Sequence, residues 1–121
     1  MKRFKTEIDQ QTDISIIKVA GELDANTAVV ADNSFTEAIA TVPSVIVVDL
    51  TELQYISSAG LGVILAAFHE CRSKGIHLLF FGLQPKTKNV LEILGLEKVI
   101  TIFRTREEAL QAARNITGST R

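Results

Sequence analysis

The pattern of hydrophobic and polar positions predicts a chain that alternates between short strands and longer helices. Residues 4–9 and 14–20 are β-rich and are separated by a polar run, so they predict an antiparallel hairpin. Residues 45–50 form an apolar run bounded by turn signals, which is typical of a central strand covered on both faces. Residues 76–81 predict the next strand, and residues 99–103 predict a short edge strand.

Four segments have the spacing of helices that bury one face. Asp24 predicts the N-cap of a first helix that continues to about Thr41. A capping box at residues 105–108 predicts the start of the last helix. The positions predicted to face the core in the first three helices are Ala28, Ala31, Phe35, Ala38 and Ile39; Leu61, Ile64, Leu65 and Phe68; and Val90, Leu91 and Leu94.

The resulting order, β-β-α-β-α-β-α-β-α, predicts a single-domain α/β sandwich with a mixed sheet of four to five strands and about four helices. A chain of 121 residues is long enough to bury one core. The domain is expected to occupy residues 1–116, and residues 117–121 are expected to form a frayed tail. No internal repeat, low-complexity stretch or linker divides the sequence.

Composition excludes several classes of function. Thirteen basic residues against fourteen acidic residues give a net charge of −1, and no basic stripe follows Lys2, Arg3 and Lys5, so nucleic-acid binding is not expected. The apolar runs are far shorter than the ~20 residues that span a bilayer, so membrane insertion is not expected either. The N-terminus lacks the apolar region of a signal peptide, and the single Cys71 cannot form an internal disulfide. These features predict a cytoplasmic protein.

The segment at residues 49–62 is a strand end followed by two serines and two glycines at the start of an apolar helix. Ser57 or Ser58 is expected to be the helix N-cap, where unpaired backbone N–H groups and the helix dipole favour a negative charge such as a phosphate. Gly60 and Gly62 each lower helix propensity by about 1 kcal/mol relative to Ala. Because they lack side chains, they are expected to let another surface approach the first turn closely.

The same run, DLTELQYISSAGLG, resembles the signature of the STAS domain, in particular that of bacterial anti-sigma-factor antagonists. In that family the serine two positions before the first glycine is phosphorylated, which implies that Ser58 is the acceptor, with Ser57 as the alternative. Many members have Asp before the acceptor and a second hydroxyl residue after it, whereas this chain has Ser57 and Ala59. Residues 19–24, VAGELD, resemble the turn after the family's second strand. The STAS fold that this resemblance implies has the predicted order of elements.

The resemblance implies an anti-sigma-factor antagonist that needs no cofactor. Unphosphorylated, it binds an anti-sigma factor that is also a serine kinase, so that the sigma factor is released; phosphorylation of Ser58 ends this binding, and a serine phosphatase restores it. The protein is expected to be a monomer or a weak dimer. The implied partner-binding residues are Glu22, Asp24, Ser57, Ser58, Ala59, Gly60 and Gly62. The alternative is a non-switching STAS scaffold, such as a regulatory subunit of a transporter or of a stress-sensing complex, in which Ser58 is only a cap.

Motifs for catalysis are missing from the sequence, so an enzyme is not expected. There is no phosphate-binding glycine loop with Lys, no kinase signature and no complete Gly-x-Ser-x-Gly elbow. A metal site is not expected either, because His69, Cys71 and His77 lack the spacing of a four-ligand cluster. Cys71 is instead expected to be packed or half-exposed.

Two groups of residues near the serines allow more than one interpretation. Asp24, Asp49 and Glu52 resemble an acidic metal cluster, but a helix cap at Asp24 and a strand end at Asp49 are favoured. Ile56 is expected to be buried. Tyr55 is left open between a core position and an exposed contact.

Overall fold

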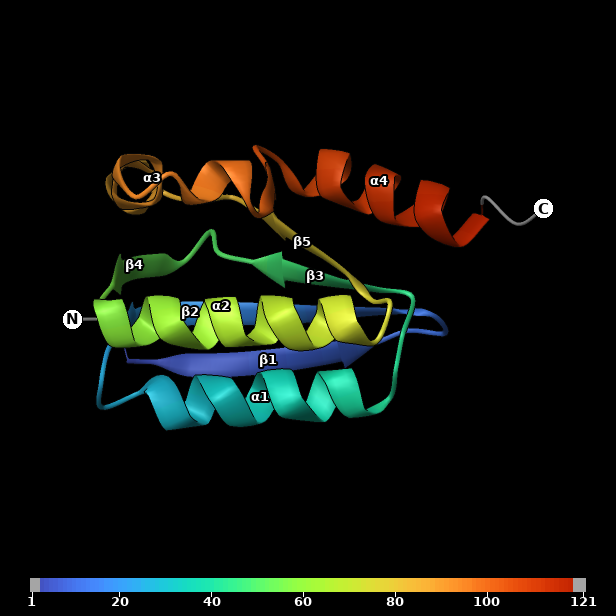
Figure 1. The fold of residues 1–121 in the computed structure, drawn as a ribbon, viewed down its shortest axis with the longest axis horizontal. Coiled ribbons are helices and arrows are strands. Elements are labelled where there is room, and N and C mark those ends of the chain that lie inside the picture. The colour runs from blue at the N-terminus through green and yellow to red at the C-terminus, as the bar shows by residue number, and fades with distance from the viewer. Residues whose placement is uncertain (1–2, 119–121) are drawn as a thin grey trace.

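The structure of the protein is a computed structural model that describes residues 3–118 (Figure 1). Within these residues, four α-helices and a mixed sheet of six strands follow nearly the predicted order. The elements are β1 (Lys5–Gln10), β2 (Ile14–Leu23), α1 (Ala28–Ala40), β3 (Val45–Asp49), β4 (Leu53–Ile56), α2 (Ser58–Ser73), β5 (His77–Phe81), α3 (Pro85–Ile93), the short 3₁₀ helix η1 (Leu96–Lys98), β6 (Thr101–Phe103) and α4 (Arg106–Gly118).

The sheet has the strand order β1-β2-β3-β5-β6. β1 and β2 form the predicted antiparallel hairpin, and all other pairs are parallel, as expected for strands joined through helices. The long strand β2 pairs with β3 over residues 14–18 and with β4 over residues 21–23. The end of β2 is therefore held against a second, shorter strand.

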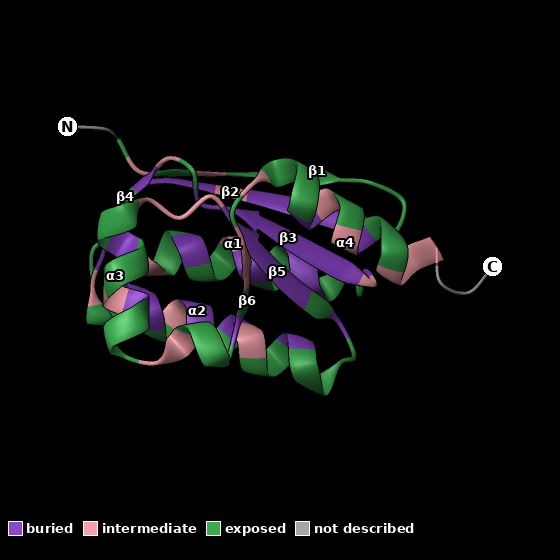
Figure 2. Ribbon diagram, turned by 90° about the horizontal axis from the view of Figure 1, so that it is seen from above, coloured by how far each residue is buried: buried purple, intermediate pink, exposed green. Residues whose placement is uncertain are grey.

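Helices cover the sheet on both faces, as predicted for an α/β sandwich. α1 and α2 pack against each other on one face, and α4 packs on β3, β5 and β6 on the other (Figures 1 and 2). The central strand β3 is buried at every residue. Of the helix positions predicted to face the core, only Leu94 is exposed, because it follows the last turn of α3 and caps it. α1 and α2 run parallel, so that their N-termini lie at the same end of the molecule (Figure 1).

The strand β4 is absent from the prediction. Its middle residues, Gln54 and Tyr55, are exposed, and only Leu53 and Ile56 are buried. Four residues of this kind give no recognisable period, and the pairing with β2 joins segments about thirty residues apart in the chain. The sheet consequently has six strands instead of the predicted four to five.

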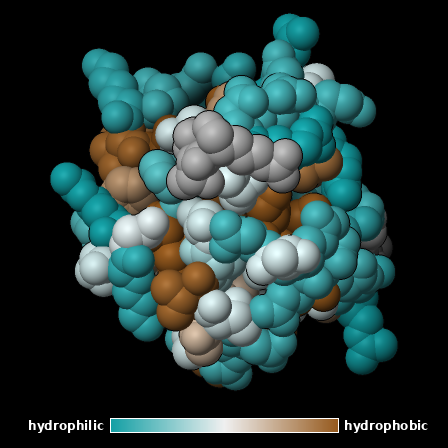
Figure 3. All heavy atoms as spheres, turned by 90° about the vertical axis from the view of Figure 1, so that its right-hand side faces the viewer, coloured by the Kyte–Doolittle hydropathy of each residue, from teal (hydrophilic) through white to brown (hydrophobic). Residues whose placement is uncertain are grey.

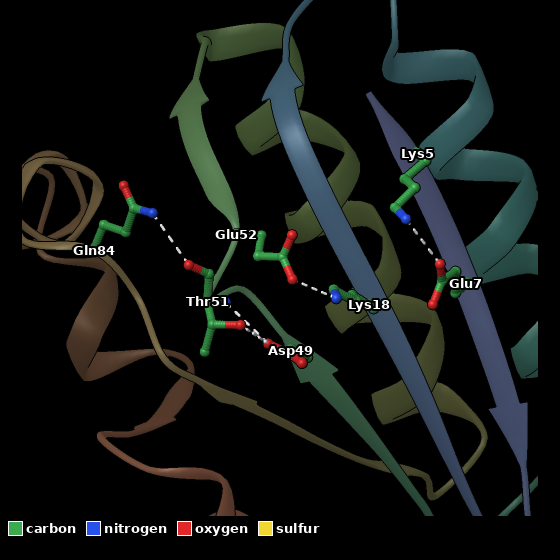
Figure 4. A network of polar contacts seen from close by, with 7 residues as sticks. All are labelled: Lys5, Glu7, Lys18, Asp49, Thr51, Glu52 and Gln84. Atoms are coloured by element: carbon green, nitrogen blue, oxygen red, sulfur yellow. Dashed lines mark hydrogen bonds and ion pairs between the residues drawn. The ribbon is translucent and has the colours of Figure 1, made fainter. Parts of the chain in front are cut away.

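Polar contacts hold the connection between β3 and β4 (Figure 4). Asp49 Oδ1 accepts hydrogen bonds from the backbone N–H of Thr51 at 2.9 Å and from its hydroxyl at 2.6 Å. The side-chain amide of Gln84 donates to Thr51 O at 3.1 Å. Lys18 on β2 forms a hydrogen-bonded ion pair with Glu52, and the hydrogen bond to the Glu52 carboxylate raises the pKa of the Lys18 ammonium. Asp49 and Glu52 thus tie β4 to the sheet.

The end of α2 and the starts of α3 and α4 follow the sequence signals. Gly75, with φ of +72°, follows α2, and Pro85 opens α3. The predicted capping box is present at α4, where Thr105 Oγ1 accepts from Glu108 N–H and Glu108 Oε1 accepts from Thr105 N–H, both at 3.2 Å. α4 continues to Gly118, beyond the predicted domain end, and residues 119–121 lie outside the described residues. Within residues 3–118, no helix combines the length and the apolar character needed to cross a bilayer.

Candidate functional site

The candidate site lies where β2 and β4 end side by side. In their parallel register, Glu22 lies opposite Tyr55, and Leu23 lies opposite Ile56. The backbone N–H of Ser57 donates a hydrogen bond to Leu23 O at 2.9 Å. The segment of Glu22 and the serine segment, which are far apart in the chain, therefore meet at one end of the sheet.

Ser57 is the N-cap of α2. Its backbone is extended, with φ of −94° and ψ of 176°, and its hydroxyl oxygen accepts a hydrogen bond from Gly60 N–H at 3.2 Å. Its carbonyl accepts the first intrahelical bond, from Leu61 N–H at 2.9 Å. The sequence left the cap open between Ser57 and Ser58, and the structure assigns it to Ser57.

Ser58 is the first residue of α2, and it is exposed. Within residues 3–118, its hydroxyl has no hydrogen-bond partner. The N–H groups of the first helical turn point toward this end of the molecule, since they have no acceptor inside the helix. Ala59 and Gly62 are also exposed, so this side of the first turn is open to solvent.

Gly60 does not belong to this open side, and the prediction that it admits a partner is wrong. It is buried, and a Cβ placed there would lie 2.7 Å from both Leu23 Cγ and Leu23 O. The close approach that Gly60 allows is made by Leu23 of the same chain. A Cβ at Gly62 would have no neighbour within 4 Å, so the open surface expected of both glycines exists only at Gly62.

The turn between β2 and α1 also differs from its prediction. Asp24 does not cap α1; the N-cap is Thr27, and the helix begins at Ala28. Asp24 Oδ1 instead accepts hydrogen bonds from Asn26 N–H at 2.9 Å and from Thr27 N–H at 3.2 Å. The Thr27 hydroxyl donates to Glu22 O at 2.8 Å. Asp24 and Thr27 thus fix the shape of the 24–27 turn, and the hydrogen bond from Ser57 N–H to Leu23 O places the start of this turn beside the serine segment. Thr27 is a residue of the site that sequence reasoning missed.

Comparison with known proteins identifies the family. The sequence model of the STAS domain matches residues 5–109, most of the chain. The chain belongs to the STAS domain family.

Several similar proteins are described as anti-sigma factor antagonists. The chain is 37% identical over 94 residues to the anti-sigma-B factor antagonist of Listeria monocytogenes, which covers 78% of this chain and 82% of that protein. It is 30% identical over 108 residues to the anti-sigma F factor antagonist of Paenibacillus polymyxa, which covers 88% and 92%. The crystal structure of an anti-sigma factor antagonist from Mycobacterium paratuberculosis superposes with a TM-score of 0.80 at 25% identity, over 93% of this chain and 95% of that one. Its architecture is thus that of this chain.

The structure also shows how far the other residues discussed in the sequence analysis are buried. Ile56 is 6% exposed, which confirms its predicted burial, and Tyr55 is 48% exposed on β4. Cys71 is buried in α2, and desolvation raises the pKa of its thiol to about 11. The thiol is therefore protonated at neutral pH and is a packed core group. In residues 3–118, no three His, Cys, Asp or Glu side chains are grouped in a way that would hold a metal ion.

The two adjacent serines should differ in their effect on stability. Ser57→Ala removes the cap of α2 and is expected to lower the free energy of unfolding by about 1 kcal/mol. Ser58→Ala removes an exposed hydroxyl without a hydrogen bond and is expected to change it by less than about 0.5 kcal/mol. Urea denaturation of both variants measures the difference. A larger loss for Ser58→Ala than for Ser57→Ala would contradict the assignment of the cap.

Proposed function

We propose that this STAS protein is an anti-sigma-factor antagonist whose binding is switched by phosphorylation of Ser58. One observation carries the proposal: within a STAS signature segment, Ser58 is exposed with a free hydroxyl, while the neighbouring Ser57 is engaged as the helix cap. The relatives described as anti-sigma-factor antagonists support the same function.

The proposed partner surface consists of the exposed side of the first turn of α2 and the 24–27 turn beside it. Ser58, Ala59 and Gly62 contribute the helix side, where small residues permit close contact. Ser57 supports this side by capping the helix. Glu22, at the end of β2, and Asp24, in the turn, contribute the other side, and both are partly accessible. Gly60 is buried beneath this surface and contributes indirectly, because its missing side chain lets α2 pack closely against Leu23.

Phosphorylation changes this surface more than it changes the fold. A phosphoryl group on Ser58 adds about 1.5 to 2 negative charges at pH 7. The N-terminal end of α2 favours a negative charge, so the protein itself accommodates the group. A partner in close contact with Ala59 and Gly62 would have to desolvate the phosphate, which is costly without a compensating cation. A complete switch from about 99% bound to about 1% bound needs a difference of about 5.5 kcal/mol.

The proposed cycle assigns the chemistry to partners. The anti-sigma factor is proposed to be the serine kinase that modifies Ser58, and a serine phosphatase is proposed to remove the phosphate. This chain would be a binding protein and substrate, not an enzyme, and would act in the cytoplasm, where sigma factors are found. The scaffold alternative predicts that Ser58 is never modified.

Phosphosite mapping tests the proposal. Incubation of the protein with the anti-sigma factor kinase and ATP, followed by peptide mass spectrometry, is expected to find one phosphate per chain, on Ser58. The Ser58→Ala variant should take up none, and Ser57→Ala should still be modified on Ser58. A phosphate confined to Ser57 would overturn the assignment, and a chain that no such kinase modifies would favour the scaffold.

A further inference from the structure

Leu23 connects the two segments of the proposed partner surface. Its carbonyl accepts the hydrogen bond from Ser57 N–H at 2.9 Å, so the end of β2 is bonded to the residue that precedes the acceptor serine. The next residue in the chain, Asp24, forms the hydrogen bonds that shape the 24–27 turn. Leu23 is therefore a direct link between the two segments: it is bonded covalently to Asp24 of the turn and hydrogen-bonded to Ser57, which precedes Ser58.

The side chain of Leu23 also fills the space that Gly60 leaves empty. Leu23 is 1% exposed, and its Cγ lies only 2.7 Å from where a Cβ of Gly60 would be. Ile56, its neighbour across the β2–β4 pair, closes the same space, with Cγ1 at 3.0 Å from that point. Close-packed interiors leave little room for a side chain to move, so the first turn of α2 has one position relative to the turn.

We propose that Leu23 is a positioning residue for the phosphorylation of Ser58: it holds the acceptor hydroxyl in register with the 24–27 turn, on which the kinase docks. This inference rests on the proposed function. In the transfer, Ser58 Oγ bonds to the γ-phosphorus of ATP, ADP leaves with the electron pair of the broken P–O bond, and the hydroxyl proton passes to a base of the kinase. Leu23 touches none of these atoms and acts only through the position of Ser58.

Truncation of Leu23 should impair transfer more than docking. A misplacement of reacting atoms by about 1 Å can cost about 100-fold in rate. For Leu23→Ala, we therefore expect kcat with ATP and the kinase that modifies the wild-type chain to fall about 10- to 100-fold, while KM for the protein substrate stays nearly unchanged. Leu23→Met keeps the side-chain volume and should restore kcat.

A matched cavity variant separates positioning from a general loss of stability. Ile39 is equally buried, at 2% exposure, but it lies in the last turn of α1, far from the N-terminus of α2 (Figure 1). Ile39→Ala should lower the melting temperature about as much as Leu23→Ala, yet leave kcat and KM near the wild-type values. The assays are run at a temperature where circular dichroism shows all variants folded. An equal loss of kcat in the two alanine variants would overturn the proposal.

Amide NMR spectra test the same positioning without a kinase. In Leu23→Ala, the resonances of Asn26 and Thr27 should shift together with those of Ser58 and Ala59, whereas Ile39→Ala should leave all four in place. Unchanged resonances of Ser58 and Ala59 in Leu23→Ala would refute the role of Leu23 even if kinase data agreed. A wild-type chain that takes up no phosphate would refute the proposed function instead, and the spectra would still decide whether Leu23 holds the two segments in register.

Discussion

Gly60→Ala is expected to destabilise the protein by about 2 kcal/mol, although the substitution raises helix propensity. The new Cβ would lie 2.7 Å from the carbonyl oxygen of Leu23, a backbone atom that cannot rotate away. Overpacking of this kind costs about 3 kcal/mol, against a gain of about 1 kcal/mol from replacing glycine in a helix. Thermal and urea unfolding measure the loss.

Gly62→Ala is the matched control, because it adds the same methyl group two residues further along the same helix. Apart from the adjoining backbone of α2, no atom lies within 4 Å of the new Cβ, and the backbone is not in the left-handed region, so the variant should gain up to about 1 kcal/mol. The two substitutions should therefore have opposite signs. Equal effects on the free energy of unfolding would show that Leu23 does not pack against Gly60 as described.

Replacement of Ser58 by Ala and by Asp should produce opposite binding phenotypes in proteins of similar stability. Ser58→Ala keeps the surface neutral, so it should bind the anti-sigma factor as the unmodified wild type does, and it should stay bound when the kinase and ATP are present. Ser58→Asp places one negative charge at the N-terminus of α2, where it is locally favourable, so the protein should stay folded while partner affinity falls. Titration calorimetry, with thermal melts of all forms, measures both properties.

Two controls accompany these variants. Asp carries less charge and bulk than a phosphoserine, so its loss of affinity should be smaller than that of the phosphorylated protein. Gly62→Leu places a large side chain on the proposed contact surface and should weaken binding without a charge. Binding of Ser58→Ala, Ser58→Asp and wild-type proteins with equal affinity would favour a scaffold role for this chain.

The periodic elements of this fold could be predicted because each carries its own local signal. The helix stripes and the central apolar strand are properties of contiguous residues. β4 has no such signal, since it is defined by its pairing with β2. The prediction for the start of α1 is wrong for a related reason. Asp and Thr are both common N-cap residue types, and only the hydrogen bonds show that Asp24 stabilises the 24–27 turn while Thr27 occupies the N-cap position.

The candidate site was only partly readable from the sequence. When two adjacent serines precede a helix, the sequence does not show which of them is the N-cap and which has the free hydroxyl. The answer depends on whether the helical backbone begins at Ser58 or one residue later. The different surroundings of the two glycines, in contrast, can be predicted from the helix period. Gly60 lies four and seven positions before Ile64 and Ala67, which places it on the buried stripe, whereas Gly62 is two residues away and faces outward. The role of Leu23 required the structure, because its contacts lie more than thirty residues away.

The opposite end of the molecule offers a less suitable contact surface for a switch at Ser58. Figure 3 shows that end, where hydrophobic residues appear in separate groups among hydrophilic ones. The N-termini of α1 and α2 lie at the other end (Figure 1). A partner that responds to phosphorylation of Ser58 must contact the end with these helix N-termini, because the effect of an exposed charge is screened beyond about 10 Å at ordinary ionic strength.

The most direct test is the affinity of the anti-sigma factor for this protein in two forms that differ by one phosphate on Ser58. Titration calorimetry of the unmodified protein and of the fully phosphorylated protein, each verified by intact mass, gives the two dissociation constants. The proposed switch predicts binding by the unmodified form and a loss between about 100-fold and about 10⁴-fold on phosphorylation. Equal dissociation constants, with both proteins folded, would contradict it.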